Sequence, residues 1–142
     1  MANEQGPIES LEVLLQTLSP RLMPGKYAYA CLSSEQAAQG AHTDGALATF
    51  RETEGTTLIV EQSIAEHAGW LVTFPCAWIQ LDVQSALNAV GLTAAVSQAL
   101  TQEGISCNVV AAYHHDHLFV PEDQAQRALQ VLQALQRKAC ST

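Results

Sequence analysis

The amino-acid sequence predicts an α+β fold built from short strands and amphipathic helices. Three observations support it: 48% of the 142 residues are apolar, apolar side chains alternate in several short segments, and longer segments repeat them at helical spacing. This apolar content is enough to bury a core, so a disordered chain is not expected. The length fits one compact domain or two small ones that share a core.

The first half of the chain combines several short elements. In chain order we expect a leucine-rich helix over 7–18, a strand over 26–32, a loop over 33–45, a hairpin of strands over 46–52 and 56–60, a short helix over 62–68 and a brief strand over 71–74. Pro20 and Pro75 should end the first helix and the last strand. Gly55 and Gly69 should form the hairpin turn and the helix end, because glycine adopts a positive φ at low cost.

The second half has clearer periodicity. We expect, in order, a strand over 76–83, a helix over 91–103 closed by Gly104, strands over 105–112 and 117–120, and a final helix from Pro121 to Lys138. This β-α-β-β-α order, with both helices apolar on one side, is the split βαβ pattern of a ferredoxin-like sandwich. The pattern lacks its last strand.

The chain is therefore predicted to form two tandem modules, over 1–74 and 75–142, that meet near Pro75. The first module is expected to be incomplete, and the second has an open sheet edge. Since an open edge exposes unpaired backbone groups, we expect the first half to supply a strand that completes the βαββαβ order of the second.

Charge and cysteine content limit the partners and the location. Six Lys and Arg against 14 Asp and Glu give a net charge of −8, which argues against nucleic acid and anionic membranes as partners. No apolar segment approaches the roughly 20 residues that span a bilayer. Without a signal-peptide pattern or CxxC spacing, the four cysteines predict reduced thiols in a cytoplasmic protein.

Catalytic signatures are missing from the sequence. It contains no P-loop, GxSxG, HExxH or GxGxxG motif, so neither an enzyme nor a cofactor is expected. Glu52 and Glu54 are interpreted as solvated hairpin carboxylates. Cys107 lies among apolar residues, which predicts an inert thiol with a raised pKa.

The run His114-His115-Asp116-His117 has three interpretations. These side chains are suitable ligands for Zn²⁺ or Ni²⁺, but no distant residue clearly completes a site, and His42 and His67 are isolated. The favoured interpretation is a turn of solvated histidines without metal. A third possibility is that imidazole titration near pH 6.5 makes ligand affinity depend on pH.

Two segments of the second half, Ala89–Val96 and Glu103–Val110, resemble the core of an ACT domain. The continuation Tyr113–Pro121 resembles one branch of that superfamily, and Phe50–Glu52 with Thr57–Val60 is similar to the first half of the same branch. This branch comprises small bacterial tandem-ACT proteins related to eukaryotic cytosolic amino-acid sensors. The resemblance implies a ferredoxin-like ACT sandwich of two modules.

ACT domains typically act as regulatory modules that bind an amino acid or a similar small ligand between paired domains. The resemblance places this ligand at the turn before the 91–103 helix, where unpaired backbone N–H groups at Gly91 suit a carboxylate. Asp116 would face the ligand's ammonium group. The implied ligand-binding residues are Asn88, Val90, Gly91, Leu92, Thr93, Asn108 and Asp116.

The expected function is non-catalytic binding of a small amino-acid-like ligand at the interface between ACT modules. A homodimer is expected, because an open sheet edge and alanine-rich helix faces favour pairing. The alternatives are a metal-binding protein that uses the histidine turn and a structural dimer without a ligand.

Overall fold

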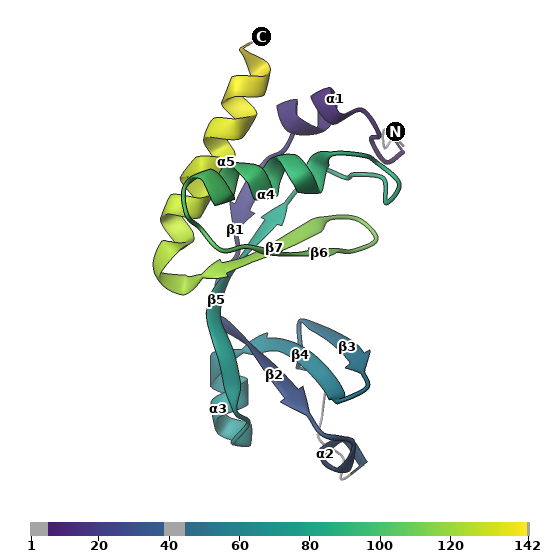
Figure 1. Cartoon of the computed structure of the whole chain (residues 1–142), viewed down its shortest axis with the longest axis vertical. Helices are drawn as coiled ribbons and strands as arrows, with labels where there is room; N and C mark the ends of the chain where they lie inside the picture. Colours follow the sequence, from purple (N-terminus) through teal and green to yellow (C-terminus); the bar gives the residue numbers. More distant parts are fainter. Residues whose placement is uncertain (1–5, 39–44, 142) are drawn as a thin grey trace, which may run out of the picture. The chain divides into compact units, whose positions relative to one another are not determined.

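The computed structural model describes residues 6–38 and 45–141 and divides the chain into two compact units. Unit 1 comprises Met1–Met23 together with Trp78–Thr142, and unit 2 is Pro24–Ala77. Residues before Pro24 thus group with the later part of the chain, whereas the predicted modules, 1–74 and 75–142, follow chain order. Each unit is described on its own (Figure 1).

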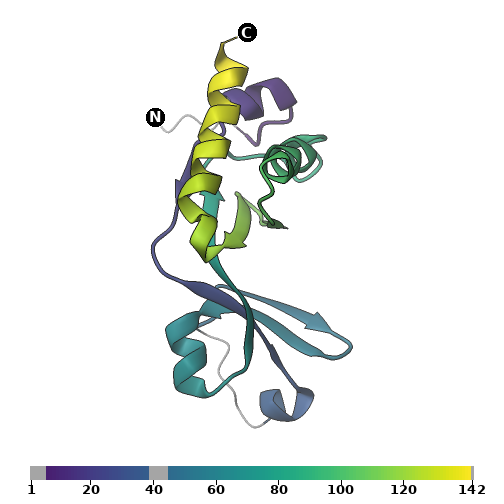
Figure 2. The same cartoon turned by 60° about the vertical axis from the view of Figure 1, so that its left-hand side comes forward.

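Unit 1 is a four-stranded sheet with three helices. Its elements are α1 (Leu11–Gln16), β1 (Pro20–Leu22), the later part of β5 (Val72–Leu81), α4 (Leu92–Gln102), β6 (Asn108–Ala111), β7 (Asp116–Pro121), the 3₁₀ turn η1 (Glu122–Gln124) and α5 (Ala125–Cys140). The strands lie in the order β1-β5-β7-β6, and α1, α4 and α5 pack against one another (Figures 1 and 2).

The strand that completes this sheet comes from the beginning of the chain. β1 pairs antiparallel with β5, with Pro20 opposite Leu81 and Leu22 opposite Ile79. With β5 as the first strand, the order βαββαβ is thereby complete, and the prediction that the first half supplies the missing strand is confirmed. The core of the unit contains these buried side chains: Leu14, Leu18, Ile79, Leu81, Leu92, Val96, Leu100, Leu118, Val120, Ala128 and Leu132.

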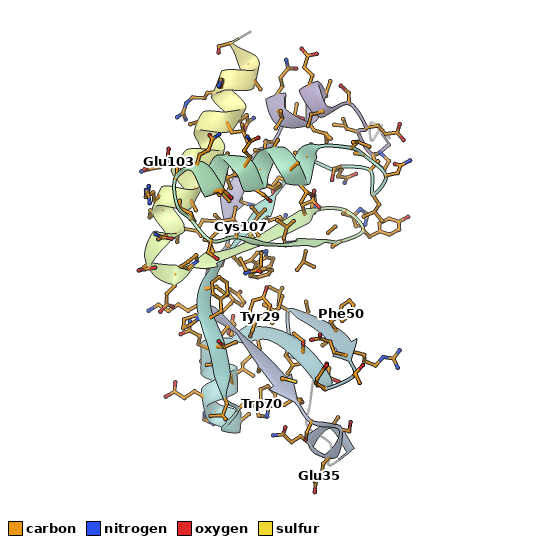
Figure 3. All side chains as sticks on the ribbon, viewed as in Figure 1. Tyr29, Glu35, Phe50, Trp70, Glu103 and Cys107 are labelled. Carbon is orange, nitrogen blue, oxygen red and sulfur yellow. The ribbon has the colours of Figure 1, made fainter. Side chains whose placement is uncertain are left out.

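Unit 2 has the same element order in one contiguous segment. Its elements are β2 (Tyr27–Leu32), α2 (Ser34–Ala38), β3 (Ala48–Glu52), β4 (Gly55–Glu61), α3 (Gln62–Ala68) and the first part of β5. The strands lie in the order β3-β4-β2-β5. Ala30, Leu32, Leu58, Val60 and Ala65 form its core, with Trp70 packed against them (Figure 3). The expectation that the first module is incomplete is corrected, since β5 supplies its fourth strand.

The sequence did not predict this because Pro75 was expected to end the strand. β5 instead continues through Pro75 with an irregularity beside it: the register with β2 shifts between Tyr27 and Tyr29, and Phe74 has a φ of 54°. A proline, which has no N–H to donate, is tolerated where a bulge interrupts the ladder. The two units are therefore joined by a continuous strand rather than by a loop at this position.

The other predicted elements are largely confirmed, with shifted ends. α3 is closed by Gly69, which has a φ of 72°, and the short helix α2 occupies the first part of the predicted loop 33–45, of which residues 39–44 lie outside the described residues. α1 begins at Leu11 and not at Pro7, because the N–H and C=O of Ile8 bond to the backbone of Gln84 and Ala86. The apolar face of α1 is only partly in the core: Leu14 is fully buried, whereas Leu11 is exposed.

Two further sequence predictions concern cysteines and membranes. All four cysteines lie in the described part of the chain and carry reduced thiols. Among the described residues, no helix is both long and apolar enough to cross a bilayer.

Candidate functional site

The start of α4 is the point at which the sequence predicted a ligand site. Gly91 caps this helix with a φ of 105°, and its carbonyl oxygen accepts the Ala95 N–H at 2.9 Å. A Cβ on Gly91 would lie 3.0 Å from Cδ2 of Leu11. The space beside Gly91 is thus occupied by the Leu11 side chain.

A small cavity of about 60 Å³ lies next to this helix start, within unit 1. It is lined by Ser85, Ala86, Leu87, Ala89, Leu92, Thr93, Ala111 and Asp116. Three of the predicted ligand-binding residues, Leu92, Thr93 and Asp116, therefore meet at one cavity. Predicted residues that do not line it are Asn88, Val90, Gly91 and Asn108. Asn108 begins β6, whereas the cavity touches Ala111 at the other end of that strand.

Asp116 is the charged group of the cavity. It opens β7 opposite Ala111, and only 8% of its surface is exposed. Its Oδ2 accepts a hydrogen bond from Ser85 Oγ at 2.9 Å. The ion pairs found in the described residues, Arg21–Asp82 and Arg127–Glu103, do not involve it. This buried carboxylate therefore has a hydroxyl partner but no Lys or Arg partner in the described chain.

Ser85 was missed at the level of sequence. It lies in the polar loop after β5, and its backbone forms a parallel bridge with Ile8. Nothing in the local pattern of 84–88 indicates that pairing, because the partner lies about 80 positions earlier in the chain. The signal that was available is a hydroxyl-bearing residue in the short polar loop that follows a buried strand.

The histidine run does not form a metal centre: in the described ranges, no group of three or more His, Cys, Asp or Glu side chains is arranged to hold an ion. His114 is exposed and its ring contacts that of Tyr113, with centroids 4.9 Å apart. Nδ1 of His115 lies 3.5 Å from the carbonyl oxygen of Val83. His67 is exposed, and His42 lies outside the described residues.

His117 is held differently from its neighbours. Trp78 Nε1 donates a hydrogen bond to His117 Nδ1 at 3.0 Å, and the two ring centroids are 5.7 Å apart. Burial lowers the pKa of His117 below 6.5, the nearby charge of His115 lowers it further, and Asp116 acts in the opposite direction. The sequence did not reveal this pair, because the partners lie on different strands.

Cys107, in the segment that leads into β6 (Figure 3), has the inert character that the sequence predicted. Burial raises the pKa of its thiol to about 11. A thiol with such a pKa is almost entirely protonated at neutral pH, and the thiolate is the reactive form.

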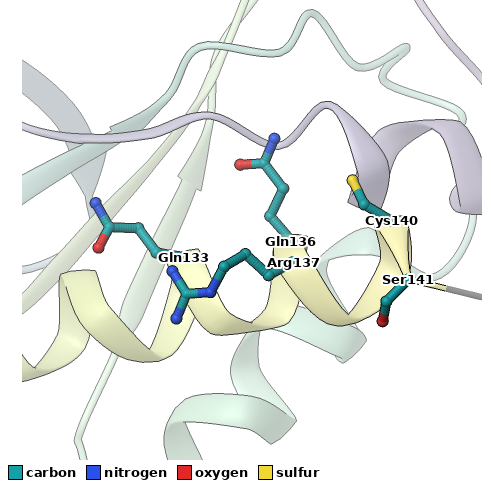
Figure 4. Close-up of a pocket in the computed structure, with 5 residues that line it drawn as sticks. All are labelled: Gln133, Gln136, Arg137, Cys140 and Ser141. Carbon is teal, nitrogen blue, oxygen red and sulfur yellow. The ribbon is translucent and has the colours of Figure 1, made fainter.

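Two larger hollows lie elsewhere. One of about 530 Å³, at the end of α5, is lined by Gln133, Gln136, Arg137, Cys140 and Ser141 (Figure 4). The side-chain amide of Gln136 already makes two structural hydrogen bonds there: it accepts one from the Ser19 N–H and donates one to the Gln16 carbonyl.

The second hollow, in unit 2, has a volume of about 400 Å³ and is lined by Tyr29, Ala30, Cys31, Thr57, Leu71, Val72 and Thr73. Its lining includes no Asp, Glu, Lys, Arg or His, so it offers no ionic contact to a ligand.

Comparison with known families agrees with this architecture. Residues 6–77 and residues 73–134 each match the ACT domain family. The chain therefore belongs to the ACT domain family and carries two ACT domains in tandem.

Solved structures with the same fold come from several bacteria. A protein of unknown function from Vibrio cholerae, described as a possible transport protein, is 43% identical with a TM-score of 0.78, over 90% of this chain and 97% of that one. A protein from Agrobacterium tumefaciens is 19% identical (TM-score 0.67, 83% and 88% covered). The ligand-free regulatory subunit of aspartate kinase from Thermus thermophilus is 11% identical (TM-score 0.65, 84% and 97% covered). No curated protein matches the chain.

Proposed function

We propose that this tandem ACT protein is a non-catalytic regulatory sensor that binds a small amino-acid-like ligand at the cavity beside α4. Membership of the ACT domain family supports the regulatory role. The fold shared with a regulatory subunit of aspartate kinase is consistent with it. The proposal of an amino-acid-like ligand is based on the side chains that line the cavity.

The observation that carries the proposal is the buried carboxylate of Asp116. A buried charge costs free energy unless it is paired, and here the partner within the described chain is the neutral Ser85 hydroxyl. A primary ammonium group placed in the cavity would supply the missing positive charge. Leu92 and Thr93, the first two residues of α4, also line the cavity, and the start of a helix suits the carboxylate of the same ligand.

The size of the cavity limits what it can enclose. Its volume of about 60 Å³ corresponds to roughly two water molecules, whereas ligand pockets usually measure about 300–1,000 Å³. It can therefore enclose an ammonium group but not a whole amino acid. Leu87 and Val90 leave 69% and 84% of their surfaces exposed in the adjoining loop. In our proposal a second copy of the chain packs on this loop and covers the rest of the ligand, in a homodimer.

Thermal unfolding in the presence of each of the twenty amino acids tests the proposal, since a ligand that binds only the folded state raises the melting temperature. Each active amino acid is compared with the carboxylic acid that lacks its amine. Asp116→Asn removes the charge but keeps an oxygen that can accept from Ser85. It should weaken amino-acid binding by about 10- to 100-fold, because a hydrogen bond to a charged group contributes about 1.5–3 kcal/mol.

The matched control is Asp123→Asn, the same change at an exposed carboxylate in η1. It should leave binding unchanged. Absence of a shift with every amino acid would refute the sensor function and favour a structural dimer without ligand. A shift with Zn²⁺ or Ni²⁺ alone would favour the metal-binding alternative. Equal losses for an amino acid and its deaminated analogue in Asp116→Asn would disprove the ammonium role.

Gly91 is unsuitable for this test. Its φ of 105° and the nearby Leu11 side chain mean that any larger residue would disturb the start of α4 directly. Loss of binding in such a variant would not distinguish a damaged helix start from a lost ligand contact.

A further inference from the structure

The pair Trp78 and His117 joins the two central strands of unit 1, β5 and β7. The indole N–H is a donor only, so the Nδ1 atom that it contacts at 3.0 Å must act as an acceptor. The His117 ring is consequently neutral, with its proton on Nε2. This arrangement makes the hydrogen bond depend on the protonation state of one histidine.

Two charged groups act directly on this ring, His115 and Asp116. His115 precedes it by two residues, and Asp116 is its neighbour in β7. Asp82, directly after β5, interacts with the charge of His115, and it accepts hydrogen bonds from Arg21 of β1 at 3.1 Å and from Gln80 at 2.8 Å. The residue opposite His117 on β6 is the apolar Val110. Positive charge on His115 opposes protonation of His117, whereas the negative charge of Asp116 favours it.

We propose that the Trp78–His117 hydrogen bond is a proton-operated latch between β5 and β7, closed while His117 is neutral and open once Nδ1 carries a proton. In the protonated ring, Nδ1–H and the indole N–H are both donors and can no longer bond to each other. The imidazolium must then rotate or withdraw from Trp78. The latch operates on the acid side of neutrality.

Opening of the latch should also affect ligand binding at the cavity, an inference that rests on the proposed function. Successive side chains of a strand point to opposite faces, so Asp116 faces the cavity while His117 faces Trp78. A movement of the backbone at His117 is therefore transmitted to the carboxylate next to it. Acid conditions should weaken amino-acid binding through this displacement.

Tryptophan fluorescence provides the direct test. In a Trp70→Phe background, Trp78 is the single indole, and its emission should titrate with a midpoint below 6.5 because a protonated imidazole quenches a nearby indole. His117→Asn keeps an acceptor near Nδ1 but cannot bind the proton, so its emission should be flat over this range. His115→Asn, the matched control, should still titrate, with a higher midpoint because a competing positive charge is removed.

Nitrogen NMR of the histidine rings provides a second, independent measurement. At about pH 8 the His117 proton should reside on Nε2. A proton on Nδ1, a titration that persists in His117→Asn, or one that disappears in His115→Asn would each overturn the latch. Melting curves at the same pH verify that each variant is folded.

Coupling to the cavity is measured separately, with the amino acid that gives the largest thermal shift. Its affinity should fall roughly fivefold or more from about pH 8 to pH 5.5 in the wild type, and much less in His117→Asn. Equal affinities at both pH values in the wild type would overturn the coupling. If no amino acid binds at either pH, the proposed function fails, whereas the fluorescence titration still decides the latch.

Discussion

Leu18→Ala tests whether the N-terminal segment is an integral part of unit 1. The Leu18 side chain is fully buried, and its backbone extends the β1–β5 ladder: its carbonyl accepts the Val83 N–H, and the next carbonyl accepts the Asp82 N–H. Removing three carbon atoms costs about 2.4 kcal/mol at about 0.8 kcal/mol each, and the cavity left behind adds to this. We expect about 3 kcal/mol in total, or a melting temperature lower by about 10 °C.

The assay combines thermal unfolding with hydrogen exchange of single amides. The Asp82 and Val83 amides should exchange about 100-fold faster, because 1.4 kcal/mol corresponds to a factor of about ten. The β2–β4 ladder of unit 2 should keep its exchange rates. Leu71→Ala, the same change at a side chain that is 92% exposed, should cost less than about 0.5 kcal/mol. If Leu18→Ala and Leu71→Ala melt alike, or if the Asp82 and Val83 amides are unaffected, the N-terminal segment is not part of that core.

Three further predictions concern pH, backbone conformation and thiol chemistry. Because folding lowers the pKa of His117, the unfolded chain takes up the proton at a higher pH than the folded chain does. The free energy of unfolding should therefore be constant above pH 6.5 and decrease below it. Calorimetry should show a smaller decrease in the variant His117→Asn. Gly55→Ala should destabilise the protein by about 1–3 kcal/mol in denaturant unfolding, because a Cβ there would overlap the Leu32 carbonyl oxygen at a φ of 152°; an unchanged midpoint would contradict this. With a pKa of about 11, Cys107 should be alkylated more slowly at about pH 8 than the exposed Cys31, as mass spectrometry of timed samples can establish; equal rates would be inconsistent with its burial.

Local sequence signals predicted most elements correctly, because their causes lie within a few residues. Gly69 and Gly104 mark helix ends and have positive φ values of 72° and 69° in the structure. The alternation over 76–83 places Ile79 and Leu81 in the core. Periodicity and helix-end residues are properties of a short window, so a single sequence contains them.

Long-range pairing was only partly predictable. The open edge of the second half indicated that a strand was missing, but β1 spans three residues, Pro20–Leu22, too few for a recognisable period. The continuation of β5 through Pro75 was hidden because a local rule for proline gave way to pairing with β2. In both cases the partner strand determines the outcome.

In the candidate site, too, some residues could be predicted from local sequence and others depend on long-range packing. The helix start at Leu92 and the acidic turn residue Asp116 were selected from the sequence, and they line one cavity. Other contacts of the site come from distant parts of the chain: Leu11 lies beside Gly91, the Ser85 hydroxyl binds Asp116, and Trp78 binds His117. A resemblance to a family indicates where to look for a ligand, but the side chains that shape the site depend on tertiary packing.

The placement of β1 has a consequence for biosynthesis. Residues 24–77 form one uninterrupted unit, so its strands and helices are translated one directly after another. The segment up to Met23 is translated before unit 2, yet its pairing partner in β5 and the helix α5 that packs on β1 are made only later. This segment therefore lacks its native neighbours until all of unit 2 has been translated, and its apolar side chains, Leu14 and Leu18 among them, stay exposed to other nascent chains during that time.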